Sequence, residues 1–177
     1  MRPYDAVTLD MGGTLVRAGA DFGAGLPPGV PPSFWAALVR HRAESVRTGR
    51  EIDLRAVLAE AGADDPAAAV SRLLEREADS LAPFPDALDT LRALRARGYR
   101  LVLLSNVWGP SQPYADALER LGIGPLLDGA VFSFDVGWRK PHPAIFRAAL
   151  LETGTEAART LHVGDKLTRD VKGAKEA

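Results

Sequence analysis

Short apolar runs followed by polar residues recur along this chain of 177 residues. Continuous apolar runs of this length are typical of strands that are buried on both faces of a parallel sheet. Because ligands of such sheets bind in the crevice beyond the carboxyl ends of the strands, polar residues at several strand ends converge there. The runs and the polar residues after them are 6–9 with Asp10, 101–104 with Ser105 and Asn106, 130–132 with Lys140, and 161–163 with Asp165 and Asp170.

Apolar residues at helical spacing fill the intervals between these runs. A helix followed by a buried strand is the repeating unit of an α/β fold. We therefore expect an α/β protein with a Rossmann-like parallel sheet flanked by helices. A helical segment is inserted into this fold, and the Gly- and Pro-rich stretch 19–32 at its start is interpreted as a flexible hinge. Helices are expected at 34–48, at 54–61, from Pro66, at 86–97, at 114–121, at 143–151 and from Thr168.

The composition narrows the classes of partner. The formal net charge is -1, which gives no electrostatic reason to expect nucleic acid or an anionic membrane as a partner. No cysteine is present, which excludes a thiol nucleophile and a thiolate metal site. The amino terminus lacks the apolar stretch of a signal peptide, and no run approaches the ~20 residues that span a bilayer. We expect a cytoplasmic protein that acts on a small molecule.

Taken in order, the polar groups resemble the four motifs of the haloacid dehalogenase-like (HAD) hydrolase superfamily. Residues 10–15 resemble the first motif, Ser105-Asn106 the second, Lys140-Pro141 the third, and 164–170 the fourth. Each motif alone arises often by chance, but four in order along most of the chain are specific. The resemblance implies a core domain of residues 1–15 and 84–177, and a helical cap (subfamily I type) of residues 16–83 that closes over the site.

The resemblance also implies catalytic roles for two residues. Asp10 would be the nucleophile, whose carboxylate attacks phosphorus and forms an aspartyl-phosphate that water later cleaves. Lys140 would neutralise the repulsion between this carboxylate and an incoming phosphate dianion. The remaining implied residues bind phosphate or metal: Gly12, Gly13, Thr14, Ser105 and Asn106 the phosphate, and Asp10, Gly12 (through its carbonyl), Asp165 and Asp170 a Mg²⁺ ion. Asp170 would hold a metal-bound water or orient Lys140.

One position departs from the family's phosphatases. They carry a second Asp two positions after the nucleophile, which protonates the leaving oxygen and then activates water, but this chain has Gly12 there. Losing a general acid-base typically costs ~10²- to 10⁴-fold in rate. The resemblance therefore predicts a Mg²⁺-dependent phosphatase of small phosphate esters that is weakened at this step. A residue of the cap could replace the missing Asp, with His41, Glu44 and Glu51 as candidates.

Two other functions remain open at this stage. A carbon-halogen hydrolase needs no proton donor for halide, although that branch usually has an aromatic residue at the position of Gly12 and lacks the magnesium-type fourth motif. A non-catalytic module would keep the crevice for binding a phosphorylated ligand or a partner. A phosphonate-cleaving variant requires a lysine from the cap, and the stretch 15–83 contains none.

The carboxyl-terminal end of the sequence is also unlike the family pattern. The family normally has at least one more strand after the fourth motif, whereas this sequence ends at Ala177. Without that strand, residues 160–163 would form an exposed sheet edge, which proteins usually pair or cover. We expect either a sequence that is cut short, so that the final strand is missing, or a homodimer through this edge.

Overall fold

The structure is a computed structural model that describes residues 2–17 and 25–177, so the predicted hinge at 19–32 lies partly outside the described residues. The strands are β1 (Ala6–Leu9), β2 (Val16–Arg17), β3 (Ala82–Pro83), β4 (Arg100–Ser105), β5 (Gly129–Phe132) and β6 (Thr160–Val163). The helices are α1 (Phe34–Thr48), α2 (Leu54–Glu60), α3 (Pro66–Asp79), α4 (Ala87–Ala96), α5 (Gln112–Arg120), α6 (Ser133–Val136), α7 (Pro143–Thr153) and α8 (Gly173–Glu176). A π-helical segment, Leu167–Lys172, precedes α8, and 3-10 turns occur at Gly124–Leu126 and Ala157–Arg159.

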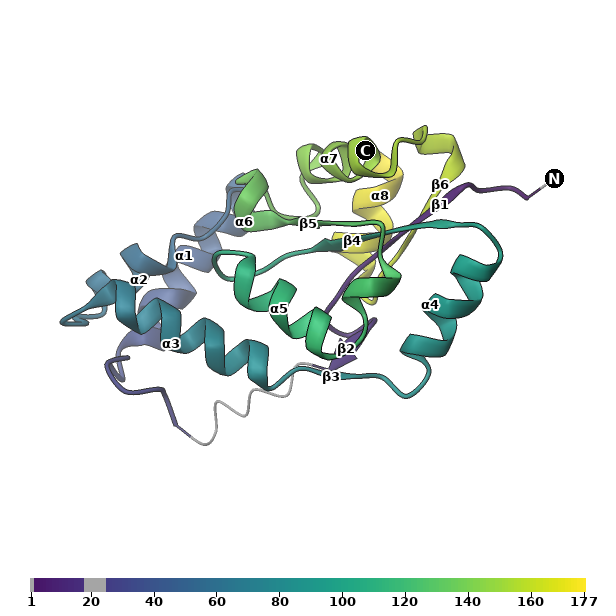
Figure 1. Cartoon of the computed structure of the whole chain (residues 1–177). Coiled ribbons are helices and arrows are strands. Elements are labelled where there is room, and N and C mark those ends of the chain that lie inside the picture. The colour runs from purple at the N-terminus through teal and green to yellow at the C-terminus, as the bar shows by residue number, and fades with distance from the viewer. Residues whose placement is uncertain (1, 18–24) are drawn as a thin grey trace.

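A four-stranded parallel sheet in the order β5-β4-β1-β6 forms the centre of the molecule (Figure 1). Strand β1 lies between β4 and β6, with Ala6 opposite both Arg100 and Thr160. The carboxyl ends of all four strands therefore meet at one edge of the sheet. This arrangement confirms the predicted α/β fold with a Rossmann-like sheet.

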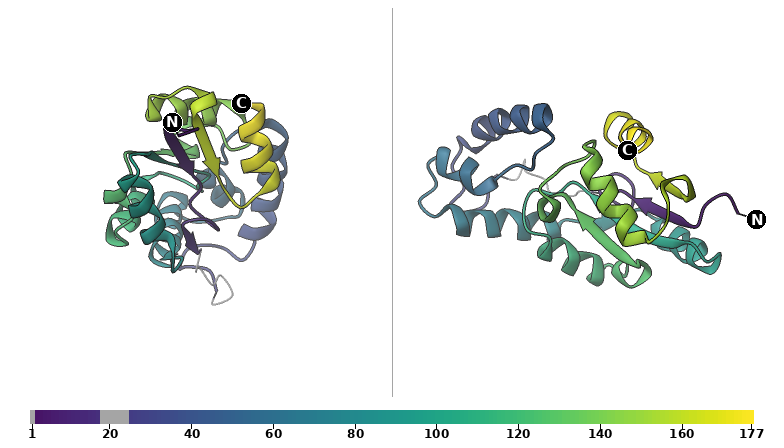
Figure 2. Two further views of the ribbon diagram at one scale, coloured as in Figure 1. Left: turned by 90° about the vertical axis from the view of Figure 1, so that its right-hand side faces the viewer. Right: turned by 90° about the horizontal axis from the view of Figure 1, so that it is seen from above.

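Helices cover both faces of the sheet, which explains the continuous apolar runs. In β4, Leu101 and Leu103 pack into the apolar cluster that includes residues of α4 and α5. The alternate residues Val102 and Leu104 pack with Ile145 of α7 on the opposite face. Helices α7 and α8 lie on this second face, and α4 and α5 on the first (Figures 1 and 2). A strand that is buried on both faces needs apolar side chains at every position.

The helices α1–α3 stand beyond the carboxyl ends of the strands (Figures 1 and 2). Each predicted helix is present: α1 ends at Gly49 with a positive φ of 73°, α2 begins after Asp53, and Pro66 is the first residue of α3. In α1, Phe34, Ala37 and Leu38 are buried, whereas the neighbouring apolar residues Trp35 and Val39 are exposed.

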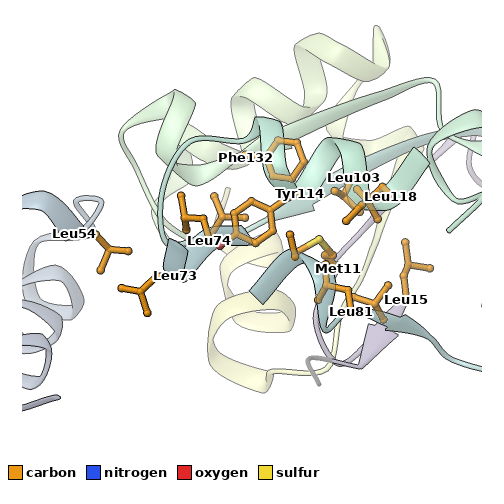
Figure 3. Close-up of a cluster of buried hydrophobic side chains, with 14 of the residues drawn as sticks. Met11, Leu15, Leu54, Leu73, Leu74, Leu81, Leu103, Tyr114, Leu118 and Phe132 are labelled. Atoms are coloured by element: carbon orange, nitrogen blue, oxygen red, sulfur yellow. The ribbon is translucent and has the colours of Figure 1, made fainter. Parts of the chain in front are cut away.

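Two features connect α1–α3 to the sheet. The short strands β2 and β3 pair antiparallel before and after the helices, a connection that the sequence analysis did not predict. One apolar cluster also runs without interruption from Leu54, Leu73 and Leu74 to Tyr114 and Phe132 (Figure 3). The inserted helices therefore share buried apolar surface with the α4/α5 face of the sheet.

Strand β6 is the last strand of the sheet among the described residues. Its outward residues Leu161 and Val163 are about two-fifths exposed, at 39% and 40%. The homodimer expected through this edge stays a prediction. In the part of the chain that the structure describes, no helix is both long enough and apolar enough to cross a membrane.

Candidate active site

Residues from all four polar groups of the sequence line one cavity of about 560 Å³ at the carboxyl edge of the sheet. Asp10 and Ser105 directly follow or end their strands, as predicted. The position of Lys140 was predicted incorrectly, because β5 ends at Phe132 and helix α6 intervenes before Lys140. The lining residues are Asp10, Met11, Gly12, Gly13, Arg17, Glu77, Leu81, Ser105, Asn106, Lys140, Asp165, Lys166 and Arg169.

Lys140 is buried and forms the centre of an ion network. Its ammonium donates to Asp10 Oδ1 at 2.8 Å and to the Leu104 carbonyl at 2.7 Å, and it lies 2.7 Å from Asp170 Oδ1. These contacts use all three N–H groups of the ammonium. The bond to Asp10 occupies only one oxygen of that carboxylate, so Lys140 fixes the orientation of Asp10 and leaves Oδ2 for another partner.

Asn106 holds the backbone of Lys140. The side-chain amide of Asn106 donates to the Lys140 carbonyl at 3.0 Å and accepts from the Lys140 N–H at 2.8 Å. Both polar ends of the amide are thus used in positioning Lys140. The predicted contact of Asn106 with phosphate stays a prediction, although the residue does line the cavity.

Asp170 supports Lys140 from beneath the cavity. The Asp170 side chain is only 1% exposed and contacts Lys140 and His162 through Oδ1, while Oδ2 accepts from the Lys166 N–H at 3.0 Å. Burial by itself would raise the pKa of Asp170, but the hydrogen bond from His162 and the charge of Lys140 hold this pKa well below its usual range. His162 also contacts Thr8 Oγ1 through Nδ1 at 2.9 Å, so both of its ring nitrogens have partners.

Asp10, Asp165 and Asp170 form an acidic cluster in which one oxygen from each lies within 4.8 Å of the others. Carboxylate oxygens are the ligands that Mg²⁺ prefers, so this donor set fits a divalent cation. Gly13 permits the cluster to form, because a Cβ built at this position would lie 2.5 Å from Asp165 Oδ2. Lys140, His162 and the Lys166 N–H already use most of the hydrogen-bonding capacity of the Asp170 carboxylate. The geometry therefore favours the role of Asp170 in orienting Lys140 over that of holding a metal-bound water.

The turn after Asp10 is bonded internally. The N–H groups of Gly13 and Thr14 donate to the carbonyls of Val16 and Met11, and Thr14 does not line the cavity. These two N–H groups are therefore engaged in the turn, and the part of Gly13 and Thr14 in phosphate binding stays a prediction. Gly12 faces open space, because no atom lies within 4 Å of a Cβ built there.

None of the three suggested replacements for the missing Asp lines the cavity. His41 pairs with Glu60, Glu44 with Arg47, and Glu51 with Arg139. Four charged residues line the cavity but were not predicted from the sequence: Arg17, Glu77, Lys166 and Arg169. Lys166 and Arg169 lie within the fourth motif and could have been suggested by that position, whereas no sequence signal distinguishes Glu77 within α3.

A Rossmann-like sheet that gathers carboxylates and a buried ammonium at one cavity defines a protein of the type that transfers phosphoryl or similar groups. The model of the haloacid dehalogenase-like hydrolase family matches residues 4–177. The chain belongs to this family, as the order of its motifs predicts.

Known proteins similar to this chain include phosphatases and dehalogenases. Glyceraldehyde 3-phosphate phosphatase of Methanothermobacter thermautotrophicus is 40% identical over 97 residues, which are 55% of this chain and 42% of that relative. A crystal structure of a HAD phosphatase from Thermococcus onnurineus has a TM-score of 0.71 and 28% identity, covering 97% of this chain and 82% of the other. A 2-haloacid dehalogenase from Pseudomonas syringae pv. Tomato has a TM-score of 0.72, covering 98% of this chain and 83% of the other; at 24% identity it shows the fold alone.

Proposed function

We propose that this protein is a phosphatase that hydrolyses a small phosphate ester through an aspartyl-phosphate at Asp10. The observation that carries the proposal is the buried network of Asp10, Lys140 and Asp170, of which Asp10 and Lys140 line one cavity together with Asp165. Arg17, Lys166 and Arg169 line the same cavity and give it the positive charge that attracts a phosphate dianion. Similarity to phosphatases of small metabolites supports the same class of substrate.

The chemistry divides into two displacements at phosphorus. In the first, the free carboxylate oxygen of Asp10 attacks and the ester oxygen leaves; in the second, water attacks and Asp10 leaves. Lys140 holds Asp10 in the orientation for attack and balances the charge that the phosphate brings into the site. Ser105, which is buried at the end of β4 and lines the cavity, would donate a hydrogen bond to a phosphoryl oxygen.

The acidic cluster is suited to holding Mg²⁺. Asp10 and Asp165 would provide carboxylate oxygens and Gly12 its backbone carbonyl, while Asp170 would orient Lys140. When bound, the ion would supply charge neutralisation between the carboxylates and the phosphate. Close packing of Asp165 against Gly13 supports this assignment, since only a residue without a side chain leaves room for that carboxylate.

We further propose that residues 16–83 act as the cap and that residues 1–15 and 84–177 form the catalytic core. The position of α1–α3 beyond the carboxyl ends of the strands supports this division (Figure 2). The paired β2 and β3 would be the connection between the two parts. Glu77, in the last turn of α3, and Leu81, just after α3, line the cavity. These two residues of the proposed cap are placed to contact the leaving group.

Hydrolysis of p-nitrophenyl phosphate with and without Mg²⁺ tests the proposed function. We expect metal-dependent turnover that Asp10→Asn abolishes, while the control Asp64→Asn, which changes an exposed carboxylate between α2 and α3, leaves it unchanged. Equal turnover in Asp10→Asn and the wild type would refute the proposal. Chloride release from 2-chloropropionate without metal would assign the protein to the carbon-halogen hydrolases instead, and phosphate binding without turnover would indicate a binding module.

A further inference from the structure

We propose that Glu77, at the end of α3, is the general acid-base that takes the place of the side chain missing at Gly12. The inference deepens the proposed phosphatase function and rests on it. Glu77 and Gly12 line the same cavity as Asp10 but come from different elements, since Glu77 belongs to the inserted helices and Gly12 to the turn after β1. The open space at Gly12 leaves room for a leaving group in this cavity.

Glu77 differs in its partners from the other carboxylates that line the cavity. Asp10 is paired with Lys140, and Asp165 with Lys166. Glu77 belongs to no ion pair within the described ranges 2–17 and 25–177. Arginine keeps its proton at all relevant pH values, and Lys166 is engaged by Asp165, so the basic residues of the wall are poor proton donors. Glu77 is thus the lining residue best suited to transfer a proton.

Aromatic residues hold Glu77 in place. The hydroxyl of Tyr114 donates to Glu77 Oε2 at 2.5 Å, and the side chain of Trp108 lies close enough to the carboxylate to lower its pKa. Tyr114 is fully buried and stacks on Phe132, so the donor itself has a fixed position. A carboxyl group has about four sites for hydrogen bonds, and two remain for a substrate or a water.

The surroundings of Glu77 favour its protonated form. Burial raises the pKa of Glu77 and is the largest effect on it. The interactions with Tyr114 and Trp108 and the charge of Arg139 lower this pKa by less. In the cavity, Asp10 and Asp165 act in the same direction as burial, and the four basic lining residues act against it. Burial and the nearby Glu77 raise the pKa of Tyr114 far above its usual range, so Tyr114 keeps its proton. A carboxyl group tuned upward in this way is suited to general acid catalysis.

The proton balance closes over the two displacements. As the Asp10 oxygen bonds to phosphorus and the ester bond breaks, the carboxylic acid proton of Glu77 passes to the leaving oxygen and an alcohol departs. As water attacks the aspartyl-phosphate and the bond from Asp10 to phosphorus breaks, the carboxylate of Glu77 accepts a proton from that water. Both residues are then in their starting states.

The test compares two leaving groups in Glu77→Gln. Nitrophenolate departs without protonation, whereas an alkoxide does not, so in single-turnover measurements we expect the first step on an alkyl phosphate to slow ~10²- to 10⁴-fold and the burst of nitrophenolate release to change little. The second step, in which Glu77 accepts a proton from water, should slow for both substrates. The matched control is Glu75→Gln, an exposed carboxylate two residues earlier in α3. Adding Gly12→Asp to Glu77→Gln should restore alkyl phosphate turnover, because the new carboxyl supplies the proton from the turn after β1.

A second variant protects the test against a folding defect. Tyr114→Phe keeps the stacked ring but removes a hydrogen bond that lowers the pKa of Glu77. The alkaline limb of the pH profile for the first step on an alkyl phosphate, where Glu77 loses its proton, should therefore move to higher pH. Equal losses in the first step on both substrates, no loss in that step on either, or an unmoved limb in Tyr114→Phe would overturn the assignment of Glu77. These outcomes differ from failure of the proposed function, in which the wild type hydrolyses neither ester or does so without Asp10.

Discussion

Replacing Lys140 with methionine should strongly destabilise the protein, because it removes the only ammonium from a buried network of carboxylates. The side chains of Lys140, Asp10 and Asp170 are 2%, 9% and 1% exposed, so solvent screens their interaction weakly. Breaking a buried ion pair by removing one partner costs about 3–5 kcal/mol, since a buried charge is left uncompensated. For a chain of this size that corresponds to a decrease in Tm of roughly 6–20 °C.

Urea unfolding followed by circular dichroism, in EDTA, measures this cost. The matched control is Lys172→Met, which removes an ammonium that is 66% exposed and pairs with Glu176 at 3.7 Å. Exposed pairs contribute about 0–1 kcal/mol, so the control should unfold near the wild-type midpoint. Adding Asp170→Asn to Lys140→Met should recover part of the loss, because the second change removes one of the stranded charges. A Lys140→Met variant that loses no more than the control would refute the reasoning.

Three further outcomes can be measured directly. Gly12→Asp alone should raise alkyl phosphate turnover, measured by phosphate release, because the site has open space for a second proton-transfer group beside Glu77; a folded variant that gives no gain either alone or together with Glu77→Gln would contradict our explanation of Gly12. Gly13→Ala, at φ 87° and against Asp165, should lower stability by about 1–2 kcal/mol and raise the Mg²⁺ concentration needed for half-maximal activity; an unchanged Tm and metal requirement would contradict the packing argument. Folding lowers the pKa of Asp170, so the stability that its carboxylate contributes is present above the unfolded pKa of ~3.9 and is lost as the pH falls below that value. In urea titrations at several pH values, the free energy of unfolding of Asp170→Asn should therefore decrease less at acid pH than that of the wild type.

The sequence predicted the sheet because its strands carry a local signal. In β4 every residue from Leu101 to Leu104 is buried, and this continuous burial is visible as an apolar run. The helices were equally predictable where terminal signals occur: the carboxylate of Asp53 accepts from two N–H groups of α2, and Gly49 ends α1 with a left-handed conformation. These features depend on neighbours within a few positions along the chain, so the sequence alone contains them.

Features that depend on distant residues were not predictable in the same way. The pairing of β2 with β3 joins Val16 to Pro83 across the inserted helices, and two-residue strands have no periodicity to detect. The motifs placed Lys140 in the crevice, but its bonds to the Asn106 amide and to Asp170 depend on the packing of three segments. Motif spacing therefore indicated which residues meet, and the structure was needed to show what each side chain contacts.

Glu77 illustrates why a replaced catalytic group is hard to find from sequence. Its suitability depends on Tyr114, 37 positions later in α5, and on Trp108 in the loop before α5, and both residues meet Glu77 only in the folded chain. Moving a proton-transfer group from the turn after β1 to α3 would also tie catalysis to the position of the inserted helices, because the acid and the nucleophile then belong to different segments. In a variant with Asp at position 12 the two groups would share one rigid turn. Leu74→Ala, in the shared apolar cluster, loosens the packing of α3. In the wild-type background this change should lower the ratio of alkyl to aryl phosphate turnover. In the Gly12→Asp background the same change should leave that ratio unchanged.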